Sequence, residues 1–465
     1  MNLFRTVETF VGSDADATSA ALSRRTFLGA SAAALCLIGF RSAQAAARDF
    51  YVSKSGSDSN PGTSGKPFLT IGAVFRRITD LGAGDRVIVM PGTYNEAVSV
   101  KAGGSASANL TLVSQVPSGA KIRSPSSAYS AINIQKSYVT IDGFDVQGAG
   151  IGHGIEASYI DGNIANNGPH HLSIVNNICH DNAGSGISVA HGDYYRIENN
   201  VCYRNCATNS FQGSGISVYE PRAVTGTETM RIFVLRNTCY SNTALTLSNN
   251  APHSDGNGII MDDFRNTQHP NPAGVYRYRS LVENNVCYFN GGKGVHVFIS
   301  DNVTVRNNTC YFNNRDPKNS ATWRGELSNV NSNNTIWVNN IGYADVKVNS
   351  YNRGILHASC GSQTSNNVVW KRNLSFNGTP GSASITQSPY NATLVAALPY
   401  ANLLGVDPLF VAAGQGVASP DLHLQPGSRA RDASVTDYGI GTVDRDGNPR
   451  TAGAAADLGA YELLQ

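Results

Sequence analysis

The octapeptide ENNVCYFN, residues Glu283–Asn290, belongs to a phrase that recurs through the middle of this 465-residue chain. Four close copies occur at Val175–Asn182 (VNNICHDN), Glu198–Asn205 (ENNVCYRN), Arg236–Asn242 (RNTCYSN) and Arg306–Asn313 (RNNTCYFN). Weaker copies follow at Val338–Tyr343 (VNNIGY) and Lys371–Asn377 (KRNLSFN). Successive copies lie about 33 residues apart on average, which is typical of a solenoid built from stacked supersecondary units.

A second phrase alternates with the first and has the form Gly-x-Gly followed by apolar residues. It reads GHGIEA, GSGISV, GSGISV, GNGIIM and GKGVHV, starting at Gly152, Gly184, Gly213, Gly256 and Gly292. RGELSN (Arg324–Asn329) and RGILHA (Arg353–Ala358) continue the series. Both phrases alternate apolar and polar residues, which is the periodicity of strands. Such short strands bury an apolar face only by stacking on their own copies, so the repeats predict an all-β, right-handed parallel β-helix.

Stacking would place equivalent residues about 4.8 Å apart along parallel ladders. The second Asn of each copy is therefore predicted to form an internal amide ladder of Asn177, Asn200, Asn237, Asn285 and Asn308. The cysteines at one place in the repeat are predicted to form a buried file of free thiols, namely Cys179, Cys202, Cys239, Cys287 and Cys310. The chain without its first 47 residues has an odd number of cysteines, which excludes a complete disulfide framework.

Composition and the N-terminus restrict the partners and the location of the protein. A formal net charge of +2 with 15% charged residues gives no indication of nucleic acid or of a membrane surface as a partner. SRRTFL (Ser23–Leu28), the apolar run Gly29–Phe40 and the small residues that follow are typical of a twin-arginine export signal. The alternative, a membrane anchor, needs a longer apolar run. The sequence predicts a monomer without a membrane span, exported to the periplasm or secreted.

The predicted organisation has four parts: the signal peptide (1–47), an N-terminal cap with the first turns (48–120), the β-helix repeats (121–405) and a closing segment (406–465). Two stretches of the cap, Asp49–Ile71 and Gly84–Glu96, resemble the start of many exported β-helix proteins. The closing segment, with VDPLFV at Val406–Val411 and DLGAYE at Asp457–Glu462, resembles their end. Over most of its length the chain resembles the family 9 polysaccharide lyases, the pectate lyase group. The resemblance implies cleavage of an acidic polysaccharide, although the same frame also carries hydrolases, epimerases and binding proteins.

The residues inside the Gly-x-Gly phrases predict a binding surface. If the turns are regular, Lys293, Arg324 and Arg353 form a basic file on three consecutive rungs, which suits the carboxylates of a polyuronate. Solvated turn residues are the alternative. Asn257 lies at the same place one rung earlier, and Tyr219 offers a ring for a sugar; both are predicted to contact the substrate.

Two positions after the second Gly, a further column is predicted to read Glu156, Ser188, Ser217, Ile260, His296, Leu327 and Leu356. His296 is the obvious proton-transfer group in the middle of it and is the predicted base, with Lys293 as the alternative. A surface His on a strand is the structural alternative. Glu326 lies where the other copies are apolar, which indicates either a shift of register or a carboxylate held near the substrate.

SDGNGIIMDDF, residues Ser254–Phe264, places three carboxylates around one apolar strand. Asp255, Asp262 and Asp263, with Glu220 on the preceding rung, predict a Ca²⁺ site, because hard cations prefer oxygen ligands. A hydrolytic acid/base pair and a structural turn are the alternatives. The resemblance implies calcium held by an Asp-Asp-Gly-x-Asp segment and a Lys base, whereas this chain has GNGII at Gly256–Ile260 and His296 in those places.

The function predicted from the sequence is therefore a lyase that cleaves a uronate-containing polysaccharide by β-elimination in a groove on the β-helix. The alternatives are a glycoside hydrolase that uses a carboxylate pair on the same groove and a non-catalytic polysaccharide-binding surface protein.

Overall fold

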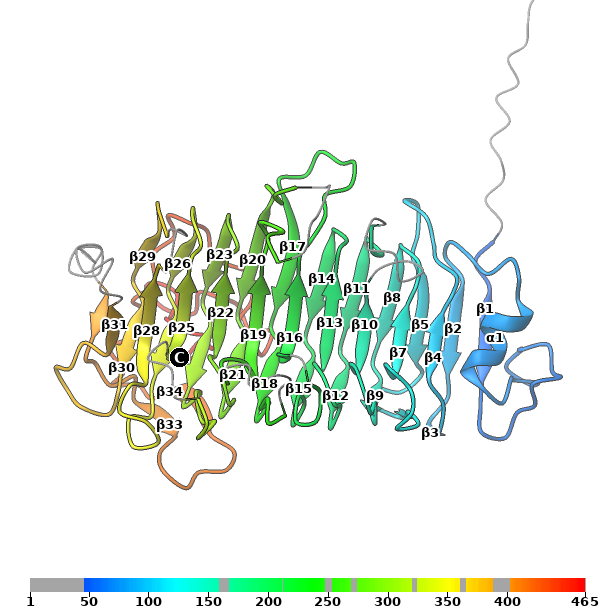
Figure 1. Cartoon of the computed structure of the whole chain (residues 1–465), viewed down its shortest axis with the longest axis horizontal. Coiled ribbons are helices and arrows are strands. Elements are labelled where there is room, and N and C mark those ends of the chain that lie inside the picture. The colour runs from blue at the N-terminus through cyan, green and yellow to red at the C-terminus, as the bar shows by residue number, and fades with distance from the viewer. Residues whose placement is uncertain are drawn as a thin grey trace, which may run out of the picture. The chain divides into compact units, whose positions relative to one another are not determined.

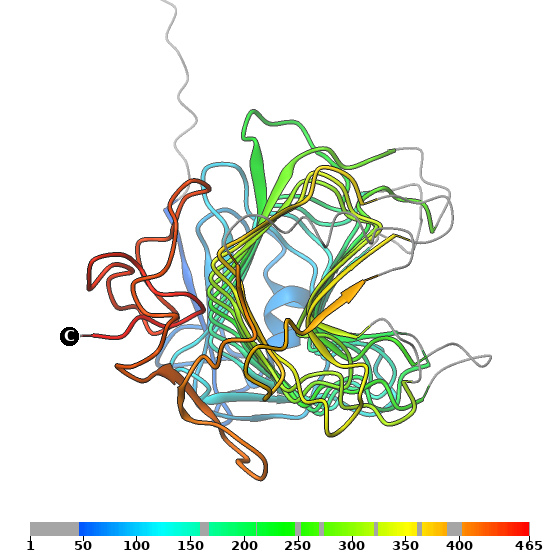
Figure 2. The ribbon, with the colours of Figure 1, turned by 90° about the vertical axis from the view of Figure 1, so that its left-hand side faces the viewer.

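A computed structural model describes residues 46–158, 167–210, 212–246, 253–268, 274–319, 324–359, 365–387 and 402–464. The predicted signal peptide lies outside these residues, except for its last two positions. The described chain winds into a right-handed parallel β-helix with three long, all-parallel sheets (Figures 1 and 2). The predicted fold class is confirmed. The one α-helix among the described residues has seven residues, and no described helix is long and apolar enough to cross a membrane.

Every full turn contributes one strand to each sheet in the order sheet 2, sheet 1, sheet 3. Sheet 1 contains β1 (Asp49–Val52), β2 (Arg86–Val89), β5 (Leu110–Ser114), β8 (Val139–Asp142), β11 (Leu172–Val175), β14 (Tyr195–Glu198), β17 (Met230–Leu235), β20 (Arg279–Glu283), β23 (Val303–Arg306), β26 (Ile336–Val338) and β29 (Val369–Lys371). Sheet 2 contains β4 (Val98–Val100), β7 (Ile132–Ile134), β10 (Ile155–Ala157), β13 (Ile187–Ala190), β16 (Ser214–Tyr219), β19 (Asn257–Asp262), β22 (Val295–Phe298), β25 (Gly325–Val330), β28 (Arg353–Ala358) and β31 (Ile385–Gln387).

Sheet 3 contains β3 (Gly92–Tyr94), β6 (Ala120–Arg123), β9 (Asp145–Gln147), β12 (Ile178–His180), β15 (Val201–Tyr203), β18 (Thr238–Tyr240), β21 (Val286–Tyr288), β24 (Thr309–Tyr311), β27 (Ile341–Tyr343), β30 (Leu374–Phe376) and β32 (Leu403–Leu404). A separate antiparallel pair, β33 (Phe410–Ala412) and β34 (Asp421–Leu424), lies in the closing segment.

The Asn-Asn phrase makes the bend between sheet 1 and sheet 3. Its first Asn adopts a left-handed conformation, with φ of 58° at Asn176, 56° at Asn199 and 56° at Asn284. Asn tolerates this region better than other residues with a Cβ. The second Asn then turns inward and is fully buried. The phrase therefore encodes both the direction of the bend and the polar group inside it.

The predicted amide ladder is confirmed, and it is longer than predicted. Each inward Asn donates through its Nδ2 to the Oδ1 of the next, at 3.1 Å from Asn177 to Asn200 and 2.9 Å from Asn285 to Asn308. The ladder continues through Asn340 and Asn373 to Asn402. Because every rung satisfies donors of the rung before it, the polar groups of the bend are buried without loss of hydrogen bonds.

A second amide ladder, which the sequence reasoning did not predict, runs along the other end of sheet 3. Its members are Asn182, Asn205, Asn242, Asn290 and Asn313. Between the two ladders lies the predicted cysteine file. Cys179, Cys202, Cys239, Cys287 and Cys310 are buried, free and paired in register, so that prediction is confirmed. Cys206 is also buried and free, and Cys360 lies outside the described residues.

A helix covers the N-terminal end of the solenoid, and the closing segment packs on its side. Helix α1 (Ile71–Arg77) packs Ile71, Ala73 and Val74 onto the first rungs, and the carboxylate of Glu96 accepts the N–H groups of Ile71 and Gly72 at its N-terminus. The closing segment lies along the outside of the β-helix (Figure 2), where its Leu422, Leu424 and Leu458 share an apolar cluster with residues of sheet 3.

Glu326 ends the second amide ladder and is expected to make the stability of the protein depend on pH. Its carboxylate is fully buried and accepts from the backbone N and the Nδ2 of Asn313, at 2.9 and 2.5 Å. Burial raises its pKa to about 8. Between about pH 4.5 and pH 8 the folded protein therefore retains a proton that the unfolded chain has lost, so the free energy of unfolding should fall as the pH rises through this window.

The Glu326→Gln variant, whose amide carries no charge at any of these pH values, should lose this part of the pH dependence. Chemical denaturation of both proteins at about pH 5 and pH 8 measures the difference. If the wild type and the variant lose the same stability between the two pH values, the raised pKa of Glu326 is contradicted.

Candidate active site

The predicted catalytic residues lie on the outer face of sheet 2, where strands β16, β19, β22 and β25 run side by side. Two columns of side chains point outward from these strands. One contains Ser217, Ile260, His296 and Ser328, and the other contains Tyr219, Asp262, Phe298 and Val330. The predicted column is therefore confirmed as far as His296 and wrong at the next rung, where Ser328 takes the place of Leu327.

This shift of register changes the predicted basic file. Val295 pairs with Leu327, so Lys293 aligns with Gly325, and Gly325 in turn aligns with Arg353. Glu326 explains the shift, because its carboxylate accepts both Asn313 donors and holds this strand one residue out of the alignment of the Gly-x-Gly phrases. The prediction of three basic residues on consecutive rungs is thus wrong at its middle member.

Arg324 lies just before β25 and points away from solvent. Its guanidinium is fully buried and donates to the carbonyl oxygen of Asn314 at 3.0 Å and to Oδ1 of Asn352 at 3.3 Å. Burial lowers its pKa. Arg353 is half-buried and donates to the carbonyl oxygens of Ser350 and Asn352. Of the two predicted carboxylate clamps, Arg324 is a fixed part of the interior, and only Arg353 keeps access to solvent.

The two predicted bases lie close enough to affect one another. His296 is 5% exposed, its Nδ1 lies 3.4 Å from the carbonyl oxygen of Ser328, and its ring lies 5.6 Å from that of Phe298. Burial, followed by the charge of Lys293, lowers the pKa of His296 well below its ordinary value. Lys293 donates from Nζ to the carbonyl oxygen of Ser254 at 2.6 Å, and burial lowers its pKa as well. His296 is therefore neutral at pH 7.

Asp262 points outward from β19 and keeps partial exposure, whereas Asp263 and Glu220 are fully buried. It lies between Tyr219 on the preceding strand and Phe298 on the next. Enclosure by protein, followed by the charges of Asp255 and Asp263, raises the pKa of Asp262 well above its ordinary value. Its Oδ1 lies 3.3 Å from Nε2 of Gln268. A carboxyl in this environment holds its proton to a higher pH than a solvated one.

Asp263 and Glu220 are buried in the bends that follow β19 and β16, where both adopt left-handed φ angles of 48° and 41°. The carboxylate of Asp263 accepts from the backbone N of Thr267, the hydroxyl of Thr267 and the backbone N of Gln268, at 2.7, 2.9 and 2.6 Å. Asp263 therefore holds a structural turn, which the sequence analysis gave as one alternative to a Ca²⁺ site. Glu220 accepts from the hydroxyl of Tyr219 at 3.1 Å and lies 3.4 Å from Nε2 of His191.

The predicted calcium ligands do not fit a metal site in this arrangement. Asp255 is engaged by Nδ2 of Asn257 at 2.6 Å, and the oxygens of Asp263 already accept three protein donors. Within the described ranges, no group of three or more His, Cys, Asp or Glu side chains is arranged to hold a metal ion. A requirement for Ca²⁺ stays a prediction.

Asn257, predicted to contact substrate, is fully buried and connects neighbouring rungs instead. Its Nδ2 donates to Oγ of Ser214 and to Oδ1 of Asp255, and its Oδ1 accepts from the backbone N of Lys293. Tyr219 is half-buried beside Asp262, at the outward position that the prediction requires. Asn257 therefore positions Asp255 and Lys293, and Tyr219 belongs to the face itself.

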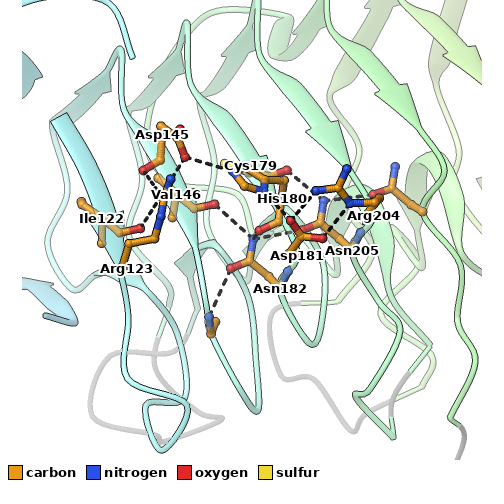
Figure 3. A network of polar contacts seen from close by, with 12 residues as sticks. Ile122, Arg123, Asp145, Val146, Cys179, His180, Asp181, Asn182, Arg204 and Asn205 are labelled. Atoms are coloured by element: carbon orange, nitrogen blue, oxygen red, sulfur yellow. Dashed lines mark hydrogen bonds and ion pairs between the residues drawn. The ribbon is translucent and has the colours of Figure 1, made fainter. Parts of the chain in front are cut away.

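Sequence reasoning missed a chain of alternating charges on the outer face of sheet 3 (Figure 3). Nε2 of His180 lies 3.0 Å from Asp145 and its Nδ1 lies 2.6 Å from Asp181. Arg123 donates to Asp145 and Arg204 donates to Asp181, at 2.8 Å each. These bonds raise the pKa of His180 against its burial. Because each charge is paired with an opposite one, the network ties rungs together and leaves no group poised for chemistry.

Several solved structures are similar to this chain. No family model and no curated protein matches the chain. Pectate lyase Pel9A, a solved structure, is 18% identical with a TM-score of 0.49, covering 89% of this chain and 96% of that one. XylC in complex with xylose is 13% identical with a TM-score of 0.45, covering 90% and 98%. A rhamnogalacturonan lyase is 17% identical with a TM-score of 0.39, covering 69% and 84%. These solved structures are what the chain is similar to, and the parallel β-helix itself is shown by its three long, all-parallel sheets.

Proposed function

We propose that this protein cleaves a uronate-containing polysaccharide by β-elimination on the outer face of sheet 2. The observation that supports the proposal is that His296 and Asp262 lie on neighbouring strands of one face, where burial lowers the pKa of His296 and raises that of Asp262. Asp262 pairs with Phe298, two positions beyond His296, so Asp262 and His296 are diagonal neighbours on parallel strands, with backbone positions about 8 Å apart. A sugar residue lying on this face would contact both.

The two groups have complementary protonation states for the reaction. Neutral His296 accepts the proton from the carbon beside the uronate carboxylate, the bond from the neighbouring carbon to the leaving oxygen breaks, and Asp262 gives its proton to that oxygen. The products are a 4,5-unsaturated uronate and a free hydroxyl end. The negative charge of the bound uronate would raise the pKa of His296 and strengthen it as a base. Lys293, three residues before His296 on the same rung, supplies positive charge for the carboxylate, and Arg353 adds a second positive charge two rungs along.

A second candidate, glycosidic hydrolysis, is favoured by one observation. The charge of Asp255 is the second largest cause of the raised pKa of Asp262. Two carboxyl groups near one another are the usual acid/base pair of glycoside hydrolases. The hydrolase would use Asp262 as the acid, as the lyase does, but would not need His296.

The experiment that separates these functions follows two signals at once. The protein is incubated with polygalacturonate, alginate and a glucuronate-containing polymer, each with added Ca²⁺ and with chelator, while ultraviolet absorbance and reducing ends are recorded. Elimination should raise both signals together, because every cleavage forms a carbon–carbon double bond conjugated with a carboxylate. His296→Ala should lose the activity, and Ser217→Ala, in the same column, should keep it.

Reducing ends that form without absorbance would establish hydrolysis and refute the lyase. If neither signal rises on any polymer, the non-catalytic alternative replaces both enzymes. Activity that persists with chelator would refute the predicted need for Ca²⁺.

A further inference from the structure

A cavity of about 440 Å³ lies over the outer face of sheet 1, whereas the candidate active site lies on sheet 2. Ser173 of β11 and Arg196 of β14 are on its floor, and Phe233 of β17 lies beyond them on the same outward column. Residues 105–109 form one end. The volume is in the range of small-ligand sites in proteins.

One side of this cavity is a stack of aromatic rings. The rings of Tyr138 and His171 are 4.5 Å apart and inclined by 19°, and those of His171 and Tyr194 are 4.2 Å apart and inclined by 12°. Each residue directly precedes a strand of sheet 1 with a left-handed φ, of 60°, 54° and 55°. This conformation is uncommon for bulky side chains, and strained residues gather at ligand sites. Its repetition on three consecutive turns holds the rings at the rim of the cavity.

The far end of the cavity is held in place by Arg231, whose side chain is 0% exposed. Its guanidinium pairs with Asp193 at 2.8 Å and donates to the carbonyl oxygens of Val224 and Gly226 at 2.9 and 2.8 Å. It also lies over the ring of Tyr194, with its central carbon 4.8 Å from the ring centre. Because these bonds fix the segment before β17 against the aromatic stack, this wall is formed before any ligand arrives.

The near end is fixed as well. Gly104 donates its N–H to the carbonyl oxygen of Tyr138 at 2.9 Å, and Nδ2 of Asn109 donates to the hydroxyl of Thr140 at 3.0 Å. The cavity is therefore bounded at both ends by backbone that is tied to the rungs. A preformed site avoids the cost of ordering loops when a ligand binds.

Both arginines on the cavity lining already have carboxylate partners. Arg231 pairs with Asp193, and Arg196 shares Glu198 with Arg236. The other polar groups on the lining are hydroxyls, an amide and the imidazole of His171, among them Ser105, Ser173 and Asn109, beside aromatic rings. This combination of hydrogen-bonding groups and ring edges suits the hydroxyls and C–H faces of a neutral sugar.

We propose that this cavity is a binding site for a neutral sugar unit of a polysaccharide, separate from the active face. The site does not depend on which reaction sheet 2 catalyses. It would retain a polymer or one of its neutral side branches while another part of the polymer occupies sheet 2.

Affinity electrophoresis of the full protein in gels that contain arabinan, galactan, xyloglucan, polygalacturonate or alginate tests this. The wild type should be retarded by at least one of the three neutral polymers. Ser173→Trp fills the floor of the cavity and should abolish the retardation. Val175→Trp places the same side chain two residues farther along β11, outside the cavity, and should leave the retardation unchanged.

Phe233→Ala, which removes a ring from the lining without adding bulk, should weaken the retardation at least several-fold. Thermal unfolding of each variant confirms that it is folded, and its turnover of a soluble uronate oligomer reports on sheet 2 alone. If no neutral polymer retards the wild type, or if Ser173→Trp migrates like the wild type in every gel, the sugar site is refuted. Loss of turnover in His296→Ala, with retardation intact, keeps the two sites distinguishable.

Discussion

Asp262→Asn is expected to slow turnover of the natural polymer by about 10²- to 10⁴-fold with little change in KM. The amide has the size and shape of the carboxyl but has no acidic proton to give to the leaving oxygen. Asp262 is an outward-facing group with a strongly raised pKa, so the substitution removes a proton donor and not a structural carboxylate. Steady-state kinetics on the best polymer from the panel measure the effect.

The pH profile provides a further readout of the same prediction. The lowered pKa of His296 places the acidic limb of kcat/KM below the ordinary value for histidine, and the raised pKa of Asp262 places the alkaline limb of kcat/KM above the ordinary value for aspartate. Asp262→Asn should lose the alkaline limb and keep the acidic one. An oligomer with an aryl leaving group, which needs no protonation, should recover most of the lost rate.

The matched control is Asp142→Asn, a half-buried carboxylate at the end of β8 that lies on sheet 1 and accepts from Asn176. It should keep wild-type turnover. If Asp262→Asn also retained its full rate on the natural polymer, the acid would have to be sought elsewhere and the assignment of sheet 2 as the active face would be lost.

How much of the structure could be predicted from the sequence depends on where a residue lies in the repeat. Within strands, identical spacing and alternation determine which side chains are stacked and which face outward, so the Asn ladder and the outward position of His296 could be predicted. The bends follow no such rule. Glu220 and Asp263 directly follow strands, and their left-handed φ angles turn them into the protein, which alternation cannot indicate.

The shift at Glu326 had a different origin. Aligning Gly-x-Gly phrases assumes that glycine determines the register, whereas the buried carboxylate of Glu326 satisfies Asn313 and determines it instead. The aromatic stack of Tyr138, His171 and Tyr194 was missed because these residues lie outside both repeated phrases. The signal was present as an aromatic or His residue just before three consecutive strands of sheet 1, β8, β11 and β14, but only the structure identifies those strand starts.

Asn200→Ala is expected to lower the free energy of unfolding by about 3–6 kcal/mol, a large part of the stability of an ordinary domain. Asn200 is fully buried, and its Oδ1 accepts from the backbone N and the Nδ2 of Asn177, at 2.9 and 3.1 Å. Its own Nδ2 donates to Oδ1 of Asn237 and to the carbonyl oxygen of Ile174. Truncation would leave the backbone N–H of Asn177 and the carbonyl oxygen of Ile174 buried without these partners, in a place that alanine does not fill.

The adjacent residue is the natural control for this prediction. Asn199 is exposed and has a φ of 56°, a conformation that glycine adopts without strain, so Asn199→Gly should cost less than about 1 kcal/mol. Chemical denaturation of the two variants therefore compares neighbours that differ in whether the amide points into the ladder. Similar midpoints for both would show that the inward amides contribute little more than the bend does. A loss confined to Asn200→Ala would show that the ladder stabilises the stacked rungs on which His296 and Asp262 are held.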